Sequence, residues 1–263
     1  MTNWFSVDPR THLAGKTAIV LGGSSGIGQA AANALAAAGA NIVVSGVPAE
    51  RCASAAEEIK AAGGTAVAVG CDATKQDEID NVVNTAVKEF GGLDIVVSSC
   101  GYAPPRQDVL EFSREDWAKV FDINLNANFF LAQTAARVMK NNPDGGRMVF
   151  VASERGILPM KDAGPYAITK AAVIGMIKSL CIDLAPYQIT VNGIGPGYVA
   201  TEMVEQVFKE LPQQKELVMS RTPLKKIGTV DEMAAAILYF CLPQASYTSG
   251  QTLMLDGGWG VNS

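Results

Sequence analysis

Histidine is almost missing from this chain of 263 residues, and its cysteines follow no recognisable pattern. The single histidine, His12, lies close to the N-terminus, which disfavours both a Ser-His-Asp triad and a histidine-based metal site. The five cysteines are odd in number and widely spaced, which fits neither a disulfide framework nor a zinc site. We therefore expect no bound metal, and reduced cysteines as in the cytoplasm.

Charge is also scarce. Charged residues make up 18% of the chain and give a net charge of −5, with no basic run. Nucleic-acid binding needs clustered Lys and Arg, so we expect no nucleic-acid partner. No apolar run approaches the roughly 20 residues of a membrane helix, and the first residues lack the apolar centre of a secretory signal. We expect a cytoplasmic protein that acts without a membrane.

Hydrophobic residues, by contrast, make up 48% of the chain. They form short Val/Ile-rich runs that alternate with helical stretches, which predicts a parallel sheet covered by helices on both faces. We expect one doubly wound α/β domain over 13–263, preceded by an N-terminal extension at 1–12. The predicted strands are 17–21, 41–45, 66–69, 93–97, 147–151, 189–192 and 252–255. The main predicted helices are 26–38, 49–62, 75–90, 114–140 and 165–184, with two further helical segments before the last strand.

Polar and glycine-rich motifs follow several of these strands, where ligands of such sheets bind. The first strand leads into LGGSSGIGQA, in which Gly22, Gly26 and Gly28 allow a tight turn, close approach of a pyrophosphate and a free helix N-terminus. A purely structural turn is the alternative. After the third strand, Asp72 could accept a hydrogen bond from an adenine amino group or cap the next helix.

Tyr166 and Lys170 lie one turn apart at the start of a predicted helix, thirteen residues after Ser153, the end of the fifth strand. A neutral phenol gains little from a nearby ammonium, but a phenolate gains a great deal. The Y-x-x-x-K spacing alone is common by chance. Asn124 is a further candidate, because asparagine has poor propensity for the interior of the long helix predicted at 114–140.

Taken together, these motifs resemble those of the short-chain dehydrogenase/reductase family over residues 13–260. The resemblance rests on the glycine motif at 22–28, Asp72, Asn124, Ser153, YAITK at 166–170, GPGYVATEM at 195–203 and GQTLMLDGG at 250–258. It implies a Rossmann-like fold with about seven parallel strands, a nicotinamide dinucleotide, and hydride transfer to or from the carbon of a small-molecule ketone or secondary alcohol. Leu21 and the Ser98-Ser99-Cys100-Gly101 stretch depart from the family pattern, but neither change removes a catalytic group.

The resemblance also implies residue roles. Tyr166 would act as general acid/base, Ser153 would polarise the substrate oxygen, Lys170 would tune the tyrosine and bind the nicotinamide ribose, and Asn124 would hold a relay water. Substrate contacts are expected from Ser153, Tyr166 and Tyr198. Cofactor contacts are expected from Gly22, Ser24, Ser25, Gly26, Ile27, Gly28, Asp72, Ala73, Ser99, Gly101, Tyr166, Lys170, Pro196, Gly197, Val199 and Thr201.

Electrostatics supports the assigned pair. A lysine charge about 6 Å from the phenol contributes roughly 3 kcal/mol, or about two pKa units, at an effective dielectric constant near 20. An oxidised nicotinamide adds further positive charge, and desolvation opposes both effects. We expect the working pKa of Tyr166 to lie nearer neutrality than its usual value near 10.

The choice between NADP and NAD rests on the end of the second strand. An NAD-selecting acid is expected near position 46, where this chain has Gly46-Val47-Pro48. Its absence favours NADP slightly, although no arginine occupies Ser25 or Val47. Arg51, with the N-terminus of its helix, could hold a phosphate, or it is an ordinary solvated surface charge.

The substrate pocket is expected between Glu154, Arg155, Met160, Tyr198 and the segment 201–227, a helical stretch broken by a proline and interpreted as a lid. Arg155 could bind a carboxylate or phosphate, but a surface or interface charge is the commoner role for such a residue. Tyr102, Arg106 and Trp259 are further candidates, with packing roles as the alternative.

Two helices carry apolar residues on more than one face, which predicts a dimer or, as the family favours, a tetramer. The residues are Trp117, Val120, Phe121, Ile123, Phe129, Phe130 and Leu131 on one helix, and Ile168, Ala171, Ala172, Val173, Ile174, Met176, Ile177, Leu180 and Cys181 on the other.

Two other functions stay open: a dinucleotide sensor without turnover, and a 3-oxoacyl-carrier-protein reductase. The first usually lacks the tyrosine or lysine, and the second needs a basic docking patch.

Overall fold

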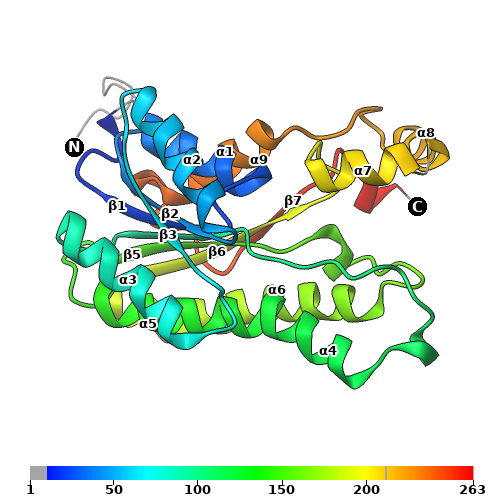
Figure 1. Ribbon diagram of the computed structural model, residues 1–263, viewed down its shortest axis with the longest axis horizontal. Helices are drawn as coiled ribbons and strands as arrows, with labels where there is room; N and C mark the ends of the chain where they lie inside the picture. The colour runs from blue at the N-terminus through cyan, green and yellow to red at the C-terminus, as the bar shows by residue number, and fades with distance from the viewer. Residues whose placement is uncertain (1–10, 211, 263) are drawn as a thin grey trace.

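Seven parallel strands form a single sheet in the computed structural model, which describes residues 11–210 and 212–262. The strand order is β3-β2-β1-β4-β5-β6-β7, so the chain turns back between β1 and β4 (Figure 1). This confirms the predicted doubly wound, Rossmann-like sheet. The strands are β1 (Thr17–Leu21), β2 (Asn41–Gly46), β3 (Thr65–Gly70), β4 (Ile95–Ser98), β5 (Gly146–Val151), β6 (Ile189–Pro196) and β7 (Thr252–Leu255).

Helices cover both faces of this sheet, as Figure 1 shows. On one face lie α1 (Gly26–Ala37), α2 (Ala49–Ala61) and α9 (Val230–Cys241); on the other lie α3 (Gln76–Phe90), α4 (Arg114–Phe121), α5 (Ala127–Met139) and α6 (Gly164–Leu184). Outside both layers, α7 (Glu202–Glu210) and α8 (Pro212–Arg221) lie beside the C-terminal segment. Short 3-10 helices are η3 (Val109–Glu111), η5 (Glu154–Gly156), η6 (Ala185–Tyr187), η7 (Pro243–Ala245) and η8 (Trp259–Val261).

The central strands are buried on both faces, because helices shield each side of the sheet. Strand β6 runs four residues beyond its predicted end at 192. The sequence of its second half, Gly-Ile-Gly-Pro, is typical of a turn. In the structure, the two glycines allow close packing against neighbouring strands. A Cβ on Gly193 would lie 2.8 Å from the Phe150 carbonyl oxygen, and one on Gly195 would lie 2.4 Å from the Met254 sulfur.

The long helix predicted at 114–140 is helical without a break from 114 to 139, but it is not a regular α-helix throughout. Between α4 and α5 the chain widens into a π-helical turn, η4 (Asp122–Asn126). Such turns insert one extra residue and often mark functional sites. Asn124 lies at the middle of this turn and is fully buried, so the interruption brings a polar side chain into the core next to α6. Periodicity alone could not reveal the interruption, because the apolar spacing continues on both sides.

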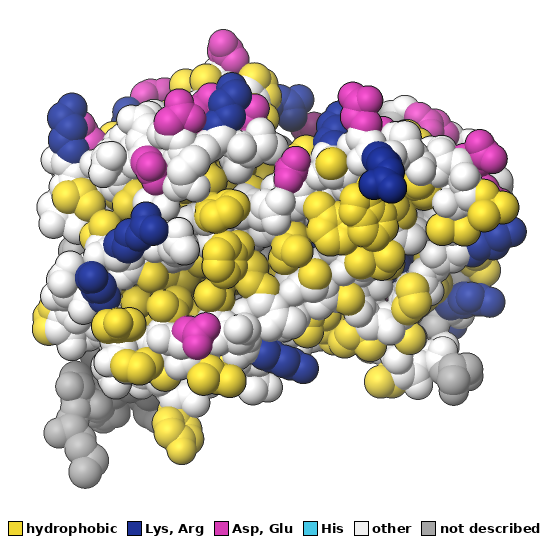
Figure 2. Space-filling view, turned by 90° about the horizontal axis from the view of Figure 1, so that it is seen from below, with side chains coloured by type: hydrophobic (Ala, Val, Ile, Leu, Met, Phe, Trp, Pro, Cys, Tyr) yellow, Lys and Arg dark blue, Asp and Glu magenta, His cyan; other side chains and the backbone are white. Residues whose placement is uncertain are grey.

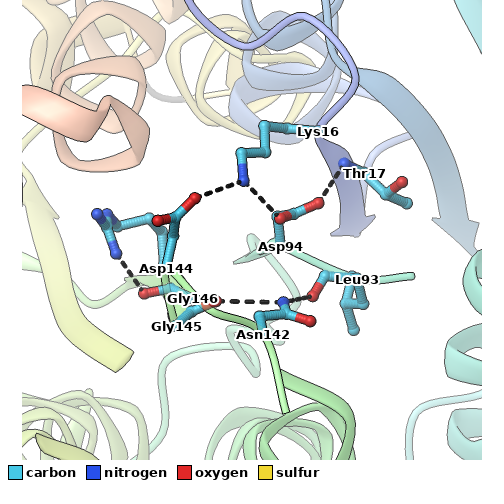
Figure 3. A network of polar contacts seen from close by, with 9 residues as sticks. Lys16, Thr17, Leu93, Asp94, Asn142, Asp144, Gly145 and Gly146 are labelled. Atoms are coloured by element: carbon cyan, nitrogen blue, oxygen red, sulfur yellow. Dashed lines mark hydrogen bonds and ion pairs between the residues drawn. The ribbon is translucent and has the colours of Figure 1, made fainter. Parts of the chain in front are cut away.

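The amino ends of the strands are joined by a polar network shown in Figure 3. Asp94 accepts hydrogen bonds from the Lys16 ammonium at 3.0 Å and from the backbone N–H of Thr17 at 2.9 Å. Asn142 donates to the carbonyl oxygens of Leu93 and Gly145 at 2.8 and 3.2 Å. These contacts fix β1 against the start of β4 at the end of the sheet opposite the carboxyl ends of the strands.

Candidate active site

A cavity of about 610 Å³ opens at the carboxyl ends of the strands, where the strand order reverses between β1 and β4. This is the position at which doubly wound sheets bind their ligands. Every predicted cofactor contact except Gly28 lines the cavity. These residues are Gly22, Ser24, Ser25, Gly26, Ile27, Asp72, Ala73, Ser99, Gly101, Tyr166, Lys170, Pro196, Gly197, Val199 and Thr201.

Gly28 lies behind the cavity wall and shapes the glycine loop instead. A Cβ at this position would lie 2.0 Å from the carbonyl oxygen of Gly22, so only glycine lets α1 begin this close to the loop. Gly22 itself has a φ of 75°, and a Cβ there would lie 3.0 Å from the backbone of Ser99. Ser25 precedes α1 without capping it through its side chain. The helix N-terminus therefore keeps N–H groups for an anionic ligand.

Ser153, Tyr166 and Lys170 come together, as the sequence predicts. Ser153 follows β5, and the other two project from the first two turns of α6. Ser153 and Tyr166 line the same cavity, and Ser153 is close enough to the Tyr166 hydroxyl to lower the pKa of the phenol. Lys170 is only 4% exposed; its ammonium donates to the Val151 carbonyl oxygen at 2.8 Å and lies 5.7 Å from the centre of the Tyr166 ring.

The pKa of Tyr166 is shifted opposite to the sequence expectation. Burial raises this pKa, although Ser153 and the charge of Arg155 act in the opposite direction. Burial also lowers the pKa of Lys170 to about 8. The expected near-neutral pKa of Tyr166 was based on attraction between its phenolate and the Lys170 ammonium. Burial removes water from both charged groups, and this desolvation has the larger effect.

Asn124 is fully buried and links three elements through its amide. Its Oδ1 accepts from the backbone N–H of Tyr102 at 2.6 Å, and its Nδ2 donates to the carbonyl oxygen of Tyr102 at 2.9 Å and to Thr169 Oγ1 at 3.0 Å. Both amide hydrogens are therefore committed to protein partners. The side chain holds the loop after β4 against α6, and the expected relay water stays a prediction.

Asp72 lies at the cavity wall in a turn rather than at a helix cap. Its carboxylate accepts from the Thr74 hydroxyl at 2.7 Å and from the Thr74 backbone N–H at 3.1 Å, contacts that lower its pKa. The N-cap of α3 is Lys75, so the alternative interpretation of Asp72 as the helix cap is wrong. The adenine contact stays a prediction.

The cofactor-selecting region combines Gly46 and Val47, which line the cavity, with an ion pair between Arg51 and Glu202. The pair spans 3.2 Å and joins α2 to the first residue of α7, and both side chains are more than half exposed. Arg51 thus has a carboxylate partner that the sequence did not indicate. Glu202 and Val204 also line the cavity, so the start of α7 borders it.

A second group of residues, the Glu154–Arg155 cluster (Glu154, Arg155, Tyr198 and Trp259), lies beside Ser153. The interpretation of Arg155 as a surface charge is wrong, because its side chain is only 12% exposed and lies 3.0 Å from Glu154. The guanidinium lies over the rings of Tyr198 and Trp259, at 5.6 and 5.8 Å from their centres. Tyr198 lines a smaller cavity of about 180 Å³ together with Glu154 and Trp259.

Burial raises the pKa of Glu154 to about 7, which the charge of Asp256 reinforces and that of Arg155 opposes. Sequence reasoning placed these residues near the substrate but missed the cluster itself. Its members come from η5, from the loop after β6 and from the C-terminal η8, and no local motif connects them.

The strand reversal, the glycine loop and the cavity between them define the class: an α/β protein of the dinucleotide-binding type, with a Ser-Tyr-Lys group in the same cavity. A family model described as "Enoyl-(Acyl carrier protein) reductase" matches residues 22–260. L-rhamnose 1-dehydrogenase (NAD(P)(+)) of Azotobacter vinelandii is 38% identical over 251 residues, covering 94% of this chain and 97% of that protein.

Solved structures agree. A 7 alpha-hydroxysteroid dehydrogenase complexed with NADH and 7-oxo glycochenodeoxycholic acid has a TM-score of 0.90 and 31% identity, covering 96% of this chain and 97% of that one. A doubly substituted short-chain dehydrogenase/reductase of Serratia marcescens has a TM-score of 0.87 and 33% identity, covering 96% and 100%. The chain belongs to the short-chain dehydrogenase/reductase family.

Proposed function

We propose that the protein is an NAD(P)-dependent oxidoreductase that transfers a hydride between the nicotinamide and a secondary alcohol or ketone of a small molecule. The observation that carries this proposal is the meeting of Ser153, Tyr166 and Lys170 at one end of a cavity that the glycine loop borders at the other. The named activities of the relatives, among them rhamnose and hydroxysteroid dehydrogenases, support it.

The chain's own residues supply binding and proton transfer. The glycine loop, Asp72 and the segment from Pro196 to Thr201 would hold a nicotinamide dinucleotide, which would supply or accept the hydride. Ser153 donates a hydrogen bond to the substrate oxygen, and Tyr166 moves the proton to or from that oxygen. Lys170 stabilises the phenolate form of the tyrosine and holds the ribose, while Asn124 fixes the loop that borders the site.

The structure of the cofactor-selecting region supports NADP slightly over NAD. The cavity wall at Gly46 and Val47 carries no carboxylate, and Arg51 is close enough to Glu202 to lie at the rim of the same cavity. Arg51 can exchange its carboxylate partner for a 2′-phosphate, since both are anionic oxygen ligands of arginine. Calorimetric titration tests this: Arg51→Ala should weaken NADP binding about tenfold and leave NAD binding within twofold.

A symmetric dimer or tetramer in the cytoplasm is also proposed. Figure 2 views the side that carries α4, α5 and α6 and shows hydrophobic side chains gathered across its centre. Exposed members are Trp117, Phe129, Phe130 and Ile168, whereas Val120, Leu131, Val173 and Ile177 belong to the core. The edge strand β7 offers a second surface, with Leu253 45% exposed. No helix in the described ranges has the length and hydrophobicity to cross a bilayer.

The direct test is a panel of ketones and secondary alcohols, followed by nicotinamide absorbance with oxidised and reduced NAD and NADP. The proposal predicts turnover of at least one carbonyl–alcohol pair. Dinucleotide binding without hydride exchange on any substrate would support a sensor instead. A strong preference for 3-oxoacyl-carrier-protein over free ketones would support the carrier-linked reductase.

Residues 201–227, with α7 and α8, are proposed to close over the substrate, and substrate-dependent protection of their amides from hydrogen exchange would test this.

A further inference from the structure

The Glu154–Arg155 cluster holds an arginine in a fixed position directly next to the proposed reaction centre. The backbone N–H of Arg155 donates to Ser153 Oγ at 3.1 Å, so the two residues are locked together. Glu154 binds one end of the guanidinium at 3.0 Å, and the rings of Tyr198 and Trp259 lie together on one side of it, with their centres 5.6 and 5.8 Å from Arg155 Cζ and 5.9 Å from each other. The ion pair and these cation–π contacts hold the side chain in place.

The hydrogen bonds of the guanidinium are incomplete. Its Nη2 donates to Glu154 and, at 3.4 Å, to the hydroxyl of Tyr198, but its Nε and Nη1 have no acceptor among the described residues. The Tyr198 hydroxyl accepts from both Arg155 and Gln214, the latter at 3.1 Å, so its own proton remains to be donated. The edge of the cluster therefore offers donors and needs an acceptor with negative charge.

The cluster lies beside the reacting groups, because the Arg155 backbone is bonded to Ser153 Oγ and the other three members line the smaller cavity. A substrate whose oxygen contacts Ser153 and whose far end enters the smaller cavity would meet the cluster there. The carboxylate of Glu154 only partly neutralises Arg155, since burial and the charge of Asp256 both favour its protonated form. The other charged groups that line the cavity of Glu154, Lys226 and Glu232, are paired with each other.

We propose that Arg155, held by Glu154 beside Tyr198 and Trp259, binds a carboxylate of the substrate, so that the protein acts on hydroxy acids and oxo acids rather than on uncharged alcohols and ketones. This inference rests on the proposed function for its site, but the carboxylate preference is separable from hydride transfer. A bidentate contact between arginine and carboxylate supplies both charge and orientation.

The test compares acetoacetate, levulinate and the next longer oxo acid with their methyl esters, which have the same carbonyl and no charge. The wild-type protein should favour at least one acid over its ester, by about 10- to 100-fold in kcat/KM. Arg155→Gln should reduce this acid-to-ester ratio to near one, and the ratio cancels any general effect on catalysis. Arg106→Gln, which alters an exposed arginine of the loop after β4, should keep the preference.

Glu154 supplies a second arm. As pH falls from about 8 to about 6, Glu154 gains a proton and competes less strongly with the substrate carboxylate for Arg155. The KM for the acid should therefore fall, whereas the KM for the ester should not. Glu154→Gln should keep a low KM for the acid across this range. The same KM trend in the wild type and in Glu154→Gln would contradict the assigned role of Glu154 and, with it, the proposal.

Calorimetric titration of the dinucleotide-loaded protein with the same acids gives a readout that does not depend on turnover. Acid binding that Arg155→Gln weakens tenfold or more supports the proposal. Turnover of the esters with no preference for any acid overturns it and leaves the proposed function standing. Transfer of the preference to Arg106 also overturns it. Acid binding that depends on Arg155, without hydride exchange on any substrate, would contradict the proposed function but support the carboxylate site.

Discussion

At the scale of one residue, the buried ammonium of Lys170 lowers the stability of the folded protein. Its ammonium is 4% exposed and makes one hydrogen bond, to the carbonyl oxygen of Val151. Burial lowers its pKa from 10.5 to about 8, and each pKa unit corresponds to about 1.4 kcal/mol. Keeping the charge therefore costs the fold about 3 kcal/mol at neutral pH. A residue kept at this cost fits a functional role better than a structural one.

Replacing this lysine with a similarly shaped apolar side chain should separate stability from activity. Lys170→Met should raise the unfolding temperature at about pH 7 and lower kcat by about 100-fold or more. The folded-state pKa lies below that of the unfolded chain, so the penalty is fully present below about pH 8 and disappears as pH rises toward 10.5. Calorimetric scans should therefore show the stability gap between variant and wild type closing in this range. A variant that melts earlier than the wild type at pH 7 would mean that the lysine stabilises the fold.

At the scale of elements, the π-helical turn η4 places Asn124 where three segments meet. Asn124→Ala leaves the backbone N–H and C=O of Tyr102 without their side-chain partner, and unpaired buried groups cost about 1–3 kcal/mol each. We expect a loss of about 2 kcal/mol or more in the free energy of unfolding by urea, with a lower kcat as the loop loosens. Asn126→Ala is the matched control: it lies in the same turn, but its side chain bonds only the exposed Asp122. Equal losses in both variants would contradict the role of Asn124.

The elements also show what the sequence could reveal. The strands were predictable because buried Val/Ile runs are local signals. The glycine loop, Ser153, Tyr166 and Lys170 were predictable because short motifs after the strands occur together and resemble those of one family. The full length of β6 and the π-helical turn were not predictable, because both depend on tertiary contacts. These contacts are the close packing around Gly193 and Gly195 and the side-chain hydrogen bonds of Asn124. The same holds for the Glu154–Arg155 cluster, whose members are distant in sequence.

At the scale of the whole molecule, the exposed aromatic side chains on α4 and α5 need a cover. Trp117 on α4 and Phe129 and Phe130 on α5 are each about two-fifths exposed. Apolar patches of this kind mark protein interfaces. Phe130→Glu should therefore reduce the assembly to smaller species in analytical ultracentrifugation at micromolar concentration. Leu110→Glu, at an even more exposed position in η3, should leave the assembly intact. A monomeric wild-type protein would contradict the proposed oligomer.

Proton transfer by the buried phenol of Tyr166 is the central step of the proposed reaction. Its most direct test is the single-turnover rate of hydride transfer in Tyr166→Phe, measured by stopped-flow absorbance with the best substrate of the panel. The account predicts a rate about 100- to 10,000-fold below that of the wild type, with dinucleotide binding still detectable by fluorescence. A Tyr166→Phe protein that transfers hydride at the wild-type rate would contradict it.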